Sequence, residues 1–204
     1  MKVYVATSNL YVGLIPEMAA RLNRYWPDQD VTILGFDVAP PEFPKNFKFH
    51  SLGVQADFGR SWTDPLKPFF ESIDDEYFVL LLDDYFLTAP VDPEMIRYAE
   101  TMVEAGVDKF DLSDDRSKER YRLYKHYSGV IESAQCAAYR VSLQAAIWNR
   151  LYLLRYMKPS RSAWDFECDG YKEAFNDGAK ILGFLDAPVK YDNAMLKGES
   201  HGVD

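Results

Sequence analysis

The feature that most constrains the fold is an apolar run, Tyr-Phe-Val-Leu-Leu-Leu over Tyr77–Leu82, that ends abruptly in two aspartates. Because successive side chains of a strand point to opposite faces of its sheet, a run without polar residues indicates a strand that is covered on both faces. Helices packed on both sides of a parallel sheet provide such cover. The run therefore predicts a central strand of an α/β sandwich, with Asp83 and Asp84 at its carboxyl end.

Strand-like and helix-like segments alternate along the rest of the chain. The pattern predicts strands over residues 2–6, 31–36, 47–52, 110–112, 134–139 and 180–185, and helices over residues 16–25, 62–73, 142–156 and 163–176. A further helix begins after Asp92, its expected N-cap, with Pro93 at its first position. Alternation with short connections predicts a three-layer α/β/α sandwich with a mainly parallel central sheet, related to the Rossmann arrangement. We find no linker or repeat, so residues 1–204 are expected to form one domain.

Composition narrows the class of protein. The net charge of −9 disfavours a dedicated nucleic-acid binder, which needs a basic face to displace counterions from phosphates. Cys136 and Cys168 give no disulfide framework, and their apolar neighbours predict that both are small core residues. The chain starts with a strand-like segment rather than a signal peptide, and no apolar run approaches the roughly 20 residues of a membrane span. We therefore expect a soluble cytoplasmic protein.

Polar residues follow three of the predicted strands at the point where each strand ends. Thr7, Ser8 and Asn9 follow the first strand, Asp37 follows the second, and Asp83-Asp84 follow the central strand. Ligands of open α/β sheets bind beyond the carboxyl ends of the strands, so these residues are predicted to line one cleft.

The aspartate pair is the sharpest of these features. Two carboxylates beside a buried strand are costly unless a cation, hydrogen bonds or solvent compensates them. A divalent ion that bridges a diphosphate is one such compensation, and oxygen ligands suit Mg²⁺ or Mn²⁺. The alternative is that Asp83 and Asp84 only cap the loop that follows.

The segment V-L-L-L-D-D-Y-F-L, residues 79–87, resembles the strand-plus-acid segment of GT-A glycosyltransferases, in which a DXD-type motif holds the metal and the sugar nucleotide. The order of elements along most of the chain is similar as well. The sequence departs from the motif at Tyr85, which stands at the place of its second aspartate. This departure favours Asp84 as the metal ligand, or else a weak or absent metal dependence.

The resemblance implies a transferase that uses a nucleoside diphosphate sugar, with a UDP-sugar favoured, and Mn²⁺ or Mg²⁺ held by Asp84 and Asp83. It places Thr7 and Asp37 at the nucleobase and ribose. Arg60 and Trp62, which precede a predicted helix, would contact the nucleotide, although they suit an ordinary loop equally well.

The C-terminal tail is a further part of this pattern. By the same resemblance, His201 would close over the diphosphate or join the metal site. A disordered chain end is the alternative for this residue.

A second constellation, S-A-W-D-F-E, spans residues 162–167. Ser162 and Asp165 have the spacing of a capping box at a helix N-terminus. Four residues on the helix that follows share one stripe of its surface: Trp164, Cys168, Tyr171 and Phe175. Glu167 lies about 60° from that stripe at 100° per residue.

Glu167 is the predicted general base. A carboxylate beside apolar rings has a raised pKa, which suits proton abstraction. In inverting GT-A enzymes an acid near this point in the chain deprotonates the acceptor hydroxyl, so the resemblance implies inversion with Glu167 as base, and Trp164 and Asp165 at the acceptor. The alternatives are a solvated glutamate and a buried core tryptophan. A saccharide is the favoured acceptor, and a modified nucleic acid is the other candidate.

Two other classes of protein compete with this hypothesis. Nucleotidyltransferases of related fold usually carry a Gly-rich loop with a basic residue after the first strand, where this chain has Thr-Ser-Asn-Leu-Tyr. A non-catalytic module that binds sugars or nucleotides is the second rival. The sequence contains no Gly-rich phosphate loop, G-x-S-x-G, CxxC or HExxH motif, which disfavours P-loop enzymes, α/β-hydrolases, zinc modules and zincins.

Overall fold

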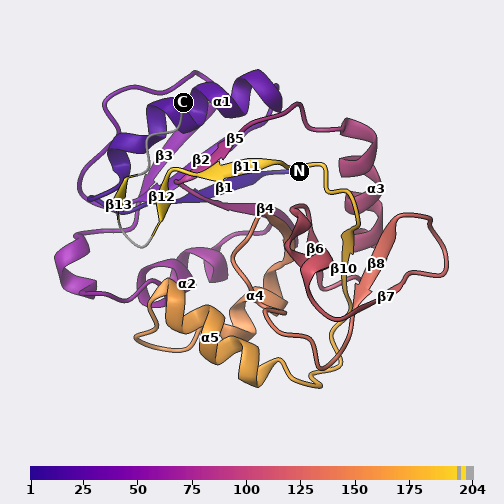
Figure 1. The fold of residues 1–204 in the computed structure, drawn as a ribbon. Coiled ribbons are helices and arrows are strands. Elements are labelled where there is room, and N and C mark those ends of the chain that lie inside the picture. Colours follow the sequence, from indigo (N-terminus) through magenta and orange to yellow (C-terminus); the bar gives the residue numbers. More distant parts are fainter. Residues whose placement is uncertain (197–198, 201–204) are drawn as a thin grey trace.

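The computed structural model describes residues 1–196 and 199–200, and a nine-stranded sheet lies at its centre (Figure 1). Its order is β3-β2-β1-β4-β9-β6-β10-β8-β7, and along these pairings β9 and β8 run against the direction of the other strands. The strands are β1 (Val3–Ala6), β2 (Val31–Gly35), β3 (Phe47–Ser51), β4 (Tyr77–Leu82), β6 (Lys109–Asp111), β7 (Tyr121–Leu123), β8 (Val130–Ser133), β9 (Ala146–Asn149) and β10 (Ile181–Phe184).

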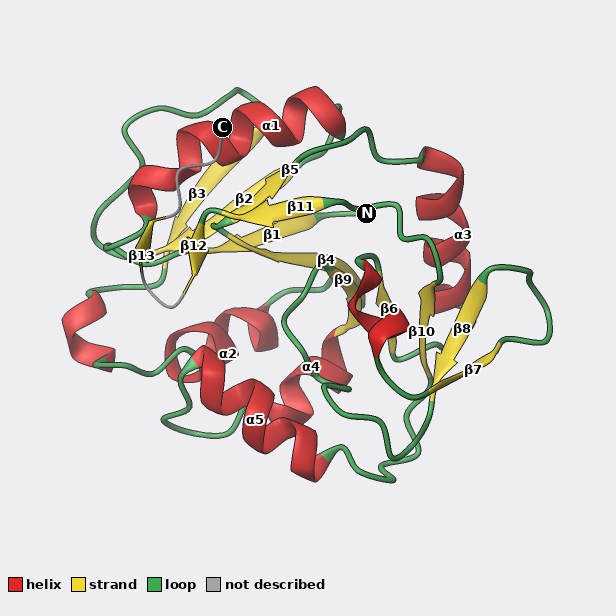
Figure 2. Cartoon of the chain, viewed as in Figure 1, coloured by secondary structure: helices red, strands yellow, loops and turns green. Residues whose placement is uncertain are grey.

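Helices cover both faces of this sheet (Figure 2). They are α1 (Ile15–Tyr25), α2 (Thr63–Ser72), α3 (Pro93–Glu104), α4 (Arg150–Tyr156) and α5 (Ala163–Glu173). Successive side chains of β1 point to opposite faces of the sheet and show the layering. Val3 and Val5 belong to a core with α1 and α3. Tyr4 and Ala6 belong to a core with α2, α4 and α5. The expected α/β/α sandwich with a mainly parallel central sheet is thereby confirmed.

Short paired strands lie outside the large sheet. β5 (Tyr85–Leu87) follows β4 directly and pairs with β11 (Tyr191–Asn193), and β12 (Met195–Leu196) pairs with β13 (Glu199–Ser200). Within the described residues, no helix combines the length and the apolar character that crossing a bilayer requires.

The start of α3 agrees with its sequence pattern. The Asp92 side chain accepts hydrogen bonds from the backbone N–H groups of Glu94 and Met95, at 2.8 and 3.4 Å. Pro93 stands at the first position, where its missing N–H costs nothing.

The predicted helix over residues 142–156 is wrong. Ala146–Asn149 form β9, which inserts between β4 and β6, and α4 begins only after this strand. Leu151, on α4, is 67% exposed. The apolar residues of β9 are buried on both faces, and a short apolar run of this kind does not distinguish a strand from a helix.

The predicted strand over residues 134–139 is also wrong, because these residues form turns and the strand β8 precedes them. Tyr139 has a positive φ of 50°, which is incompatible with a strand.

The prediction that both cysteines are small core residues is wrong as well. Cys136 lies in these turns and is exposed, and Cys168 on α5 is only partly buried.

The charged segment over residues 113–125 contributes a buried cation. Arg116 is 1% exposed, and its Nε lies 2.8 Å from Asp111 Oδ2. Lys109 Nζ lies 2.7 Å from the other oxygen of Asp111. This triad joins β6 to the turns before β9, since Arg116 also donates to the carbonyl oxygens of Ala138 and Tyr139.

A second buried ion pair fastens α4 and α5 to the edge of β10. Arg140 Nη2 lies 2.7 Å from Asp177 Oδ1, and both side chains are fully buried. Arg140 also donates to the carbonyl oxygens of Ala174 and Ala179, while Tyr152 and Tyr156 donate to Asp177 Oδ2. Removing one member of such a pair leaves a buried charge without a partner.

We expect Arg140→Met to lower the free energy of unfolding by about 3–5 kcal/mol, because Asp177 would remain buried and ionised. Urea denaturation followed by circular dichroism measures this change. The matched control is Arg122→Met, which removes a surface pair with Glu132 and should cost less than about 1 kcal/mol. Equal effects of the two substitutions would contradict the assignment.

Candidate active-site cleft

The register of three parallel strands places the residues of the site. Ala6 at the end of β1 pairs with Leu34 of β2 and with Leu82 of β4, so the residues that follow β1 and β4 emerge side by side. Thr7 Oγ1 donates a hydrogen bond of 2.6 Å to Asp83 Oδ2, and both residues are buried. The parallel register thus brings together two residues that are 76 positions apart in the chain.

A cleft of about 490 Å³ opens in front of this pair. The lining comes from the ends of β1 and β4, from the loop before α2, from the start of α5 and from the C-terminal segment: Ala6, Thr7, Ser8, Leu10, Tyr11, Phe36, Gln55, Gly59, Arg60, Ser61, Trp62, Leu82, Asp83, Asp84, Ala163 and Met195. The predicted residues Thr7, Arg60, Trp62, Asp83 and Asp84 therefore share one cleft at the carboxyl end of the sheet.

The acid pair has unusual protonation behaviour. Burial raises the pKa of Asp83 to about 7, against the lowering effect of the Thr7 hydrogen bond, and the charge of Asp84 raises it further. Burial also raises the pKa of Asp84 to about 6. In the described part of the chain neither carboxylate forms an ion pair, so the two acids carry a cost that a bound cation would remove.

Asp83 and Asp84 fit part of the ligand set of a divalent cation. No group of three His, Cys, Asp or Glu side chains that could hold a metal forms among residues 1–196 and 199–200. Mg²⁺ is commonly bound by one or two carboxylates together with substrate phosphates and water, and two neighbouring acids match that pattern. His201, predicted to join the metal site, lies outside the described residues.

Asp37 lies at the rim of the cleft and does not line it. Its Oδ1 accepts hydrogen bonds from the Asn9 side chain at 2.8 Å and from the Gln55 backbone N–H at 3.0 Å. The hydrogen bond from Gln55 has the largest effect on the pKa of Asp37, and together with the one from Asn9 it holds that pKa below its ordinary value. Asn9 N–H donates in turn to Gln55 Oε1 at 2.7 Å. This network fastens the segments after β1, β2 and β3 to one another, and the sequence patterns did not indicate Gln55.

Trp62 joins the two helices that border the cleft. Its backbone N–H donates to the carbonyl oxygen of Arg161 at 2.7 Å, and its ring lies 5.2 Å from that of Phe166 on α5. Arg60 is exposed at the opening of the same cleft.

The start of α5 has the predicted capping box. Ser162 Oγ accepts from the Asp165 backbone N–H, and Asp165 Oδ2 accepts from the Ser162 N–H, each at 3.1 Å. The buried face of α5 consists of Phe166 and Gly170. Trp164 is 68% exposed, which excludes the buried core position that was the alternative for this residue.

Glu167 lies one helical turn after Ala163, which lines the cleft, and is not itself among the lining residues. Its Oε1 accepts a hydrogen bond of 2.6 Å from the Leu143 N–H, and the carbonyl oxygen of Leu143 accepts one of 3.2 Å from the Tyr85 hydroxyl. Leu143 therefore links Glu167 to the residue after Asp84. Burial raises the pKa of Glu167, and the Leu143 hydrogen bond opposes this shift.

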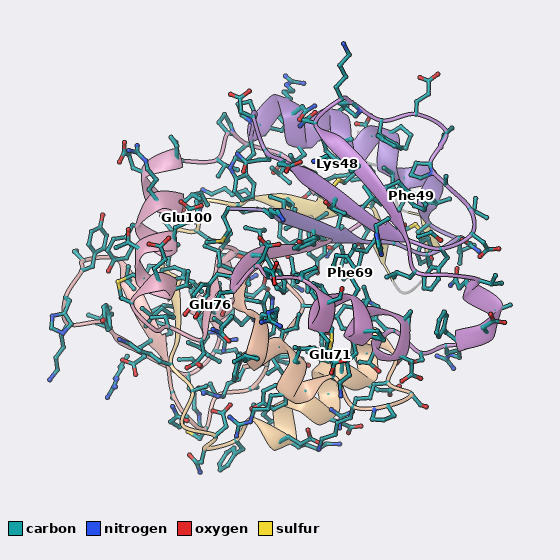
Figure 3. All side chains as sticks on the ribbon, turned by 180° about the vertical axis from the view of Figure 1, so that it is seen from behind. Lys48, Phe49, Phe69, Glu71, Glu76 and Glu100 are labelled. Atoms are coloured by element: carbon teal, nitrogen blue, oxygen red, sulfur yellow. The ribbon has the colours of Figure 1, made fainter. Side chains whose placement is uncertain are left out.

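A second acidic hollow lies at the amino ends of the strands. Glu76 and Glu100, both seen from behind in Figure 3, line it together with Met1, whose amino group is 3.4 Å from Glu100. Because ligands of open α/β sheets bind at the carboxyl ends, this rule favours the cleft at Asp83 and Asp84 over the hollow at the amino ends.

Comparison with solved structures supports the fold. The chain is similar to residues 1–349 of S. aureus TarS, with 16% identity and a TM-score of 0.57 over 95% of this chain, and it spans 61% of that one. It is similar to a UDP-glucose pyrophosphorylase complexed with UDP-glucose, with 9% identity, a TM-score of 0.55, and 93% and 91% of the two chains covered. A cytidylyltransferase from Leptospira borgpetersenii gives 9% identity, a TM-score of 0.53, and coverage of 91% and 75%.

No protein-family model matches the sequence, and no curated protein matches it either. The structural similarities confirm the GT-A-type fold that the sequence resemblance implies. At these identities the similarity is one of fold.

The raised pKa of Asp83 gives a prediction for stability in the absence of metal. The folded protein holds this proton up to about pH 7, whereas the unfolded chain releases it near pH 4, so wild-type stability falls as pH rises between these values. Asp83→Asn cannot ionise and escapes this loss. We expect the variant to gain roughly 2–4 kcal/mol relative to wild type between pH 4 and pH 8.

Urea unfolding in EDTA at several pH values measures this difference. Thr7→Val provides a comparison, because it removes the hydrogen bond that favours the ionised form and should extend the loss of stability to higher pH. A difference between Asp83→Asn and wild type that does not vary with pH would contradict the assignment.

Proposed function

We propose that the protein is a glycosyltransferase that moves a sugar from a nucleoside diphosphate sugar to an acceptor hydroxyl with inversion at the anomeric carbon. The observation that carries this proposal is the acid pair Asp83-Asp84, which faces a cleft at the carboxyl end of β4 without a cationic partner in the described residues. An anionic diphosphate and its cation would complete such a site.

The donor would lie along the cleft. Asp84 and Asp83 would hold a divalent cation, Mn²⁺ or Mg²⁺, which supplies charge stabilisation to the leaving diphosphate. Arg60 and Trp62 at the cleft opening would contact the nucleotide, and Thr7, with the Asp37 network at the rim, would shape the site for the base and ribose. A UDP-sugar is the favoured donor.

Glu167 would act as the general base. It would accept the proton of the acceptor hydroxyl while the oxygen attacks the anomeric carbon and the nucleoside diphosphate leaves. Its raised pKa and its connection through Leu143 to Tyr85, beside Asp84, support this role. Trp164 and Asp165 at the start of α5 would contact the acceptor. A saccharide is the favoured acceptor, with a modified nucleic acid as the other candidate.

A nucleotidyltransferase is the second candidate. The fold similarity supports it, because the chain is also similar to a UDP-glucose pyrophosphorylase and a cytidylyltransferase, with TM-scores of 0.55 and 0.53 against 0.57 for TarS, a GT-A-type glycosyltransferase. The loop after β1 weighs against it. That loop, residues 7–11, contains no glycine or basic residue to hold a nucleoside triphosphate.

We expect one class of nucleotide sugar to raise the melting temperature of the wild-type protein, and to do so more strongly with Mn²⁺. A thermal-shift panel of UDP-, GDP-, ADP- and CMP-sugars, each with and without the metal, measures this. The metal-dependent part should be lost in Asp84→Asn, because the amide no longer offers a charged ligand. It should also weaken below about pH 6, where Asp84 is protonated.

The control for this experiment is Asp30→Asn, which changes an exposed carboxylate that pairs with Lys48 at the amino end of β2, whereas the cleft lies at the carboxyl ends of the strands. Stabilisation by a nucleoside triphosphate, with no response to nucleotide sugars, would favour the nucleotidyltransferase. No response to any nucleotide by the folded protein would contradict both enzymes.

Glu167→Gln tests the base. The amide oxygen can still accept the Leu143 hydrogen bond, so we expect the fold and the nucleotide-induced thermal shift to be retained. The transfer rate should fall by about 10²–10⁴-fold, the usual contribution of a general base. Product analysis by NMR reports the anomeric configuration. Retained configuration, or an unchanged rate in Glu167→Gln, would show that Glu167 is not the base.

A further inference from the structure

One face of α5 exposes an unusual amount of aromatic surface. Trp164 is 68% exposed and Phe175, just beyond the helix, is 50% exposed, with the partly exposed Tyr171 between them. Tyr139, 44% exposed, stacks on Tyr171 with ring centroids 6.3 Å apart. We call these four rings the α5 aromatic stripe.

The fold does not account for this surface. The core contact of α5 is made by Phe166 and Gly170, which lie on the other side of the helix. A Cβ added to Gly170 would lie 2.5 Å from Val141, so α5 packs closely through that face. Large apolar rings left in water on a neighbouring face indicate a surface that binds a ligand or partner.

The stripe adjoins the proposed active site. Ala163, the residue before Trp164, lines the cleft that contains Asp84. At 100° per residue Glu167 lies about 60° from Trp164 and about 40° from Tyr171 around the helix. A ligand stacked on these two rings would therefore pass beside the proposed base.

The charge around the stripe selects the kind of ligand. Residues 163–175 contain four acidic side chains and one lysine. Asp169 pairs with Lys172, and Glu173 pairs with Lys158 and Arg161, so Asp165 and Glu167 are the acids of this segment without an ion pair among the described residues. These two carboxylates disfavour phosphate, sulfate and carboxylate polymers, including nucleic acids, at the Trp164 end of the stripe. The carboxylate of Glu167, which lies between the two rings and the core-facing side of α5, can accept hydrogen bonds from hydroxyl groups. Aromatic faces bordered by hydrogen-bond acceptors match sugar rings, which have apolar faces and hydroxyl edges.

We propose that the α5 aromatic stripe binds an extended, uncharged oligosaccharide, which serves as the acceptor chain of the proposed transferase and so rests on that function. The rise from Trp164 to Tyr171 is roughly 10 Å along the helix, and Phe175 extends the stripe further. Several sugar rings, rather than one, cover this length. The binding site therefore recognises a chain and presents one hydroxyl of it to Glu167.

Isothermal titration calorimetry with four hexasaccharides, namely cellohexaose, chitohexaose, maltohexaose and xylohexaose, tests this assignment. At least one should bind about tenfold or more tightly than its monosaccharide. Trp164→Ala and Tyr171→Ala should each weaken that binding about tenfold, the effect of losing one stacked ring. Leu151→Ala is the matched control, because this apolar residue on α4 is 67% exposed and lies outside the stripe.

Several results would overturn the proposal. These are no binding of any hexasaccharide at millimolar concentration, equal binding by Trp164→Ala and wild type, and tighter binding of a heparin hexasaccharide or of oligo-dT. A dimer in light scattering that Trp164→Ala dissociates would assign the stripe to a second copy of the chain.

The nucleotide-sugar thermal shift, repeated on Trp164→Ala, separates this proposal from the proposed function. It should match wild type, since the ring lies outside the donor cleft. If no nucleotide raises the melting temperature of the wild-type protein, but a hexasaccharide still binds through the stripe, the transferase is refuted. The saccharide site then remains supported.

Discussion

The buried carboxylate at the end of β4 is the constraint on which the site depends. Asp83 is held by Thr7 across the parallel register of β1 and β4, and burial raises its pKa to about 7. A carboxylate in this position destabilises the empty protein once it ionises, and a bound cation would reverse that cost. The same acid therefore links pH, stability and the binding of a charged ligand. Asp84 beside it shares this behaviour to a smaller degree.

The rest of the fold positions other segments around this acid pair. On the side of β1, β2 and β3, the hydrogen bonds of Asp37 with Asn9 and Gln55 hold the loops together at the rim. On the other side, buried cations replace purely apolar packing. Arg140 with Asp177, and Asp111 with Lys109 and Arg116, fix turns that have little regular structure of their own. The first residue of α5, Ala163, lines the cleft as well.

This arrangement gives α5 two distinct faces. Phe166 and Gly170 pack against the core, and Trp164 and Tyr171 face solvent, with Glu167 between these faces and fastened to Leu143. A helix that begins at the cleft and carries an exposed aromatic stripe suits a transferase in which the donor lies in the cleft and the acceptor approaches along the surface. The acidic side chains along α5 extend the negative charge of the protein to that surface.

The sequence by itself determined the apolar run of β4 and the acids that end it, the caps of α3 and α5, and most of the strands before residue 113, because local patterns and end residues decide such elements. Only the tertiary structure decided that residues 146–149 form β9, because a run buried on both faces carries no period. It also turned Arg116 inward, toward the carbonyl oxygens of Ala138 and Tyr139, which lie more than 20 residues away in the chain. Trp164 points outward because α5 packs through Phe166 and Gly170. The grouping of Thr7 with Asp83 likewise required the register of two strands that lie more than 70 residues apart.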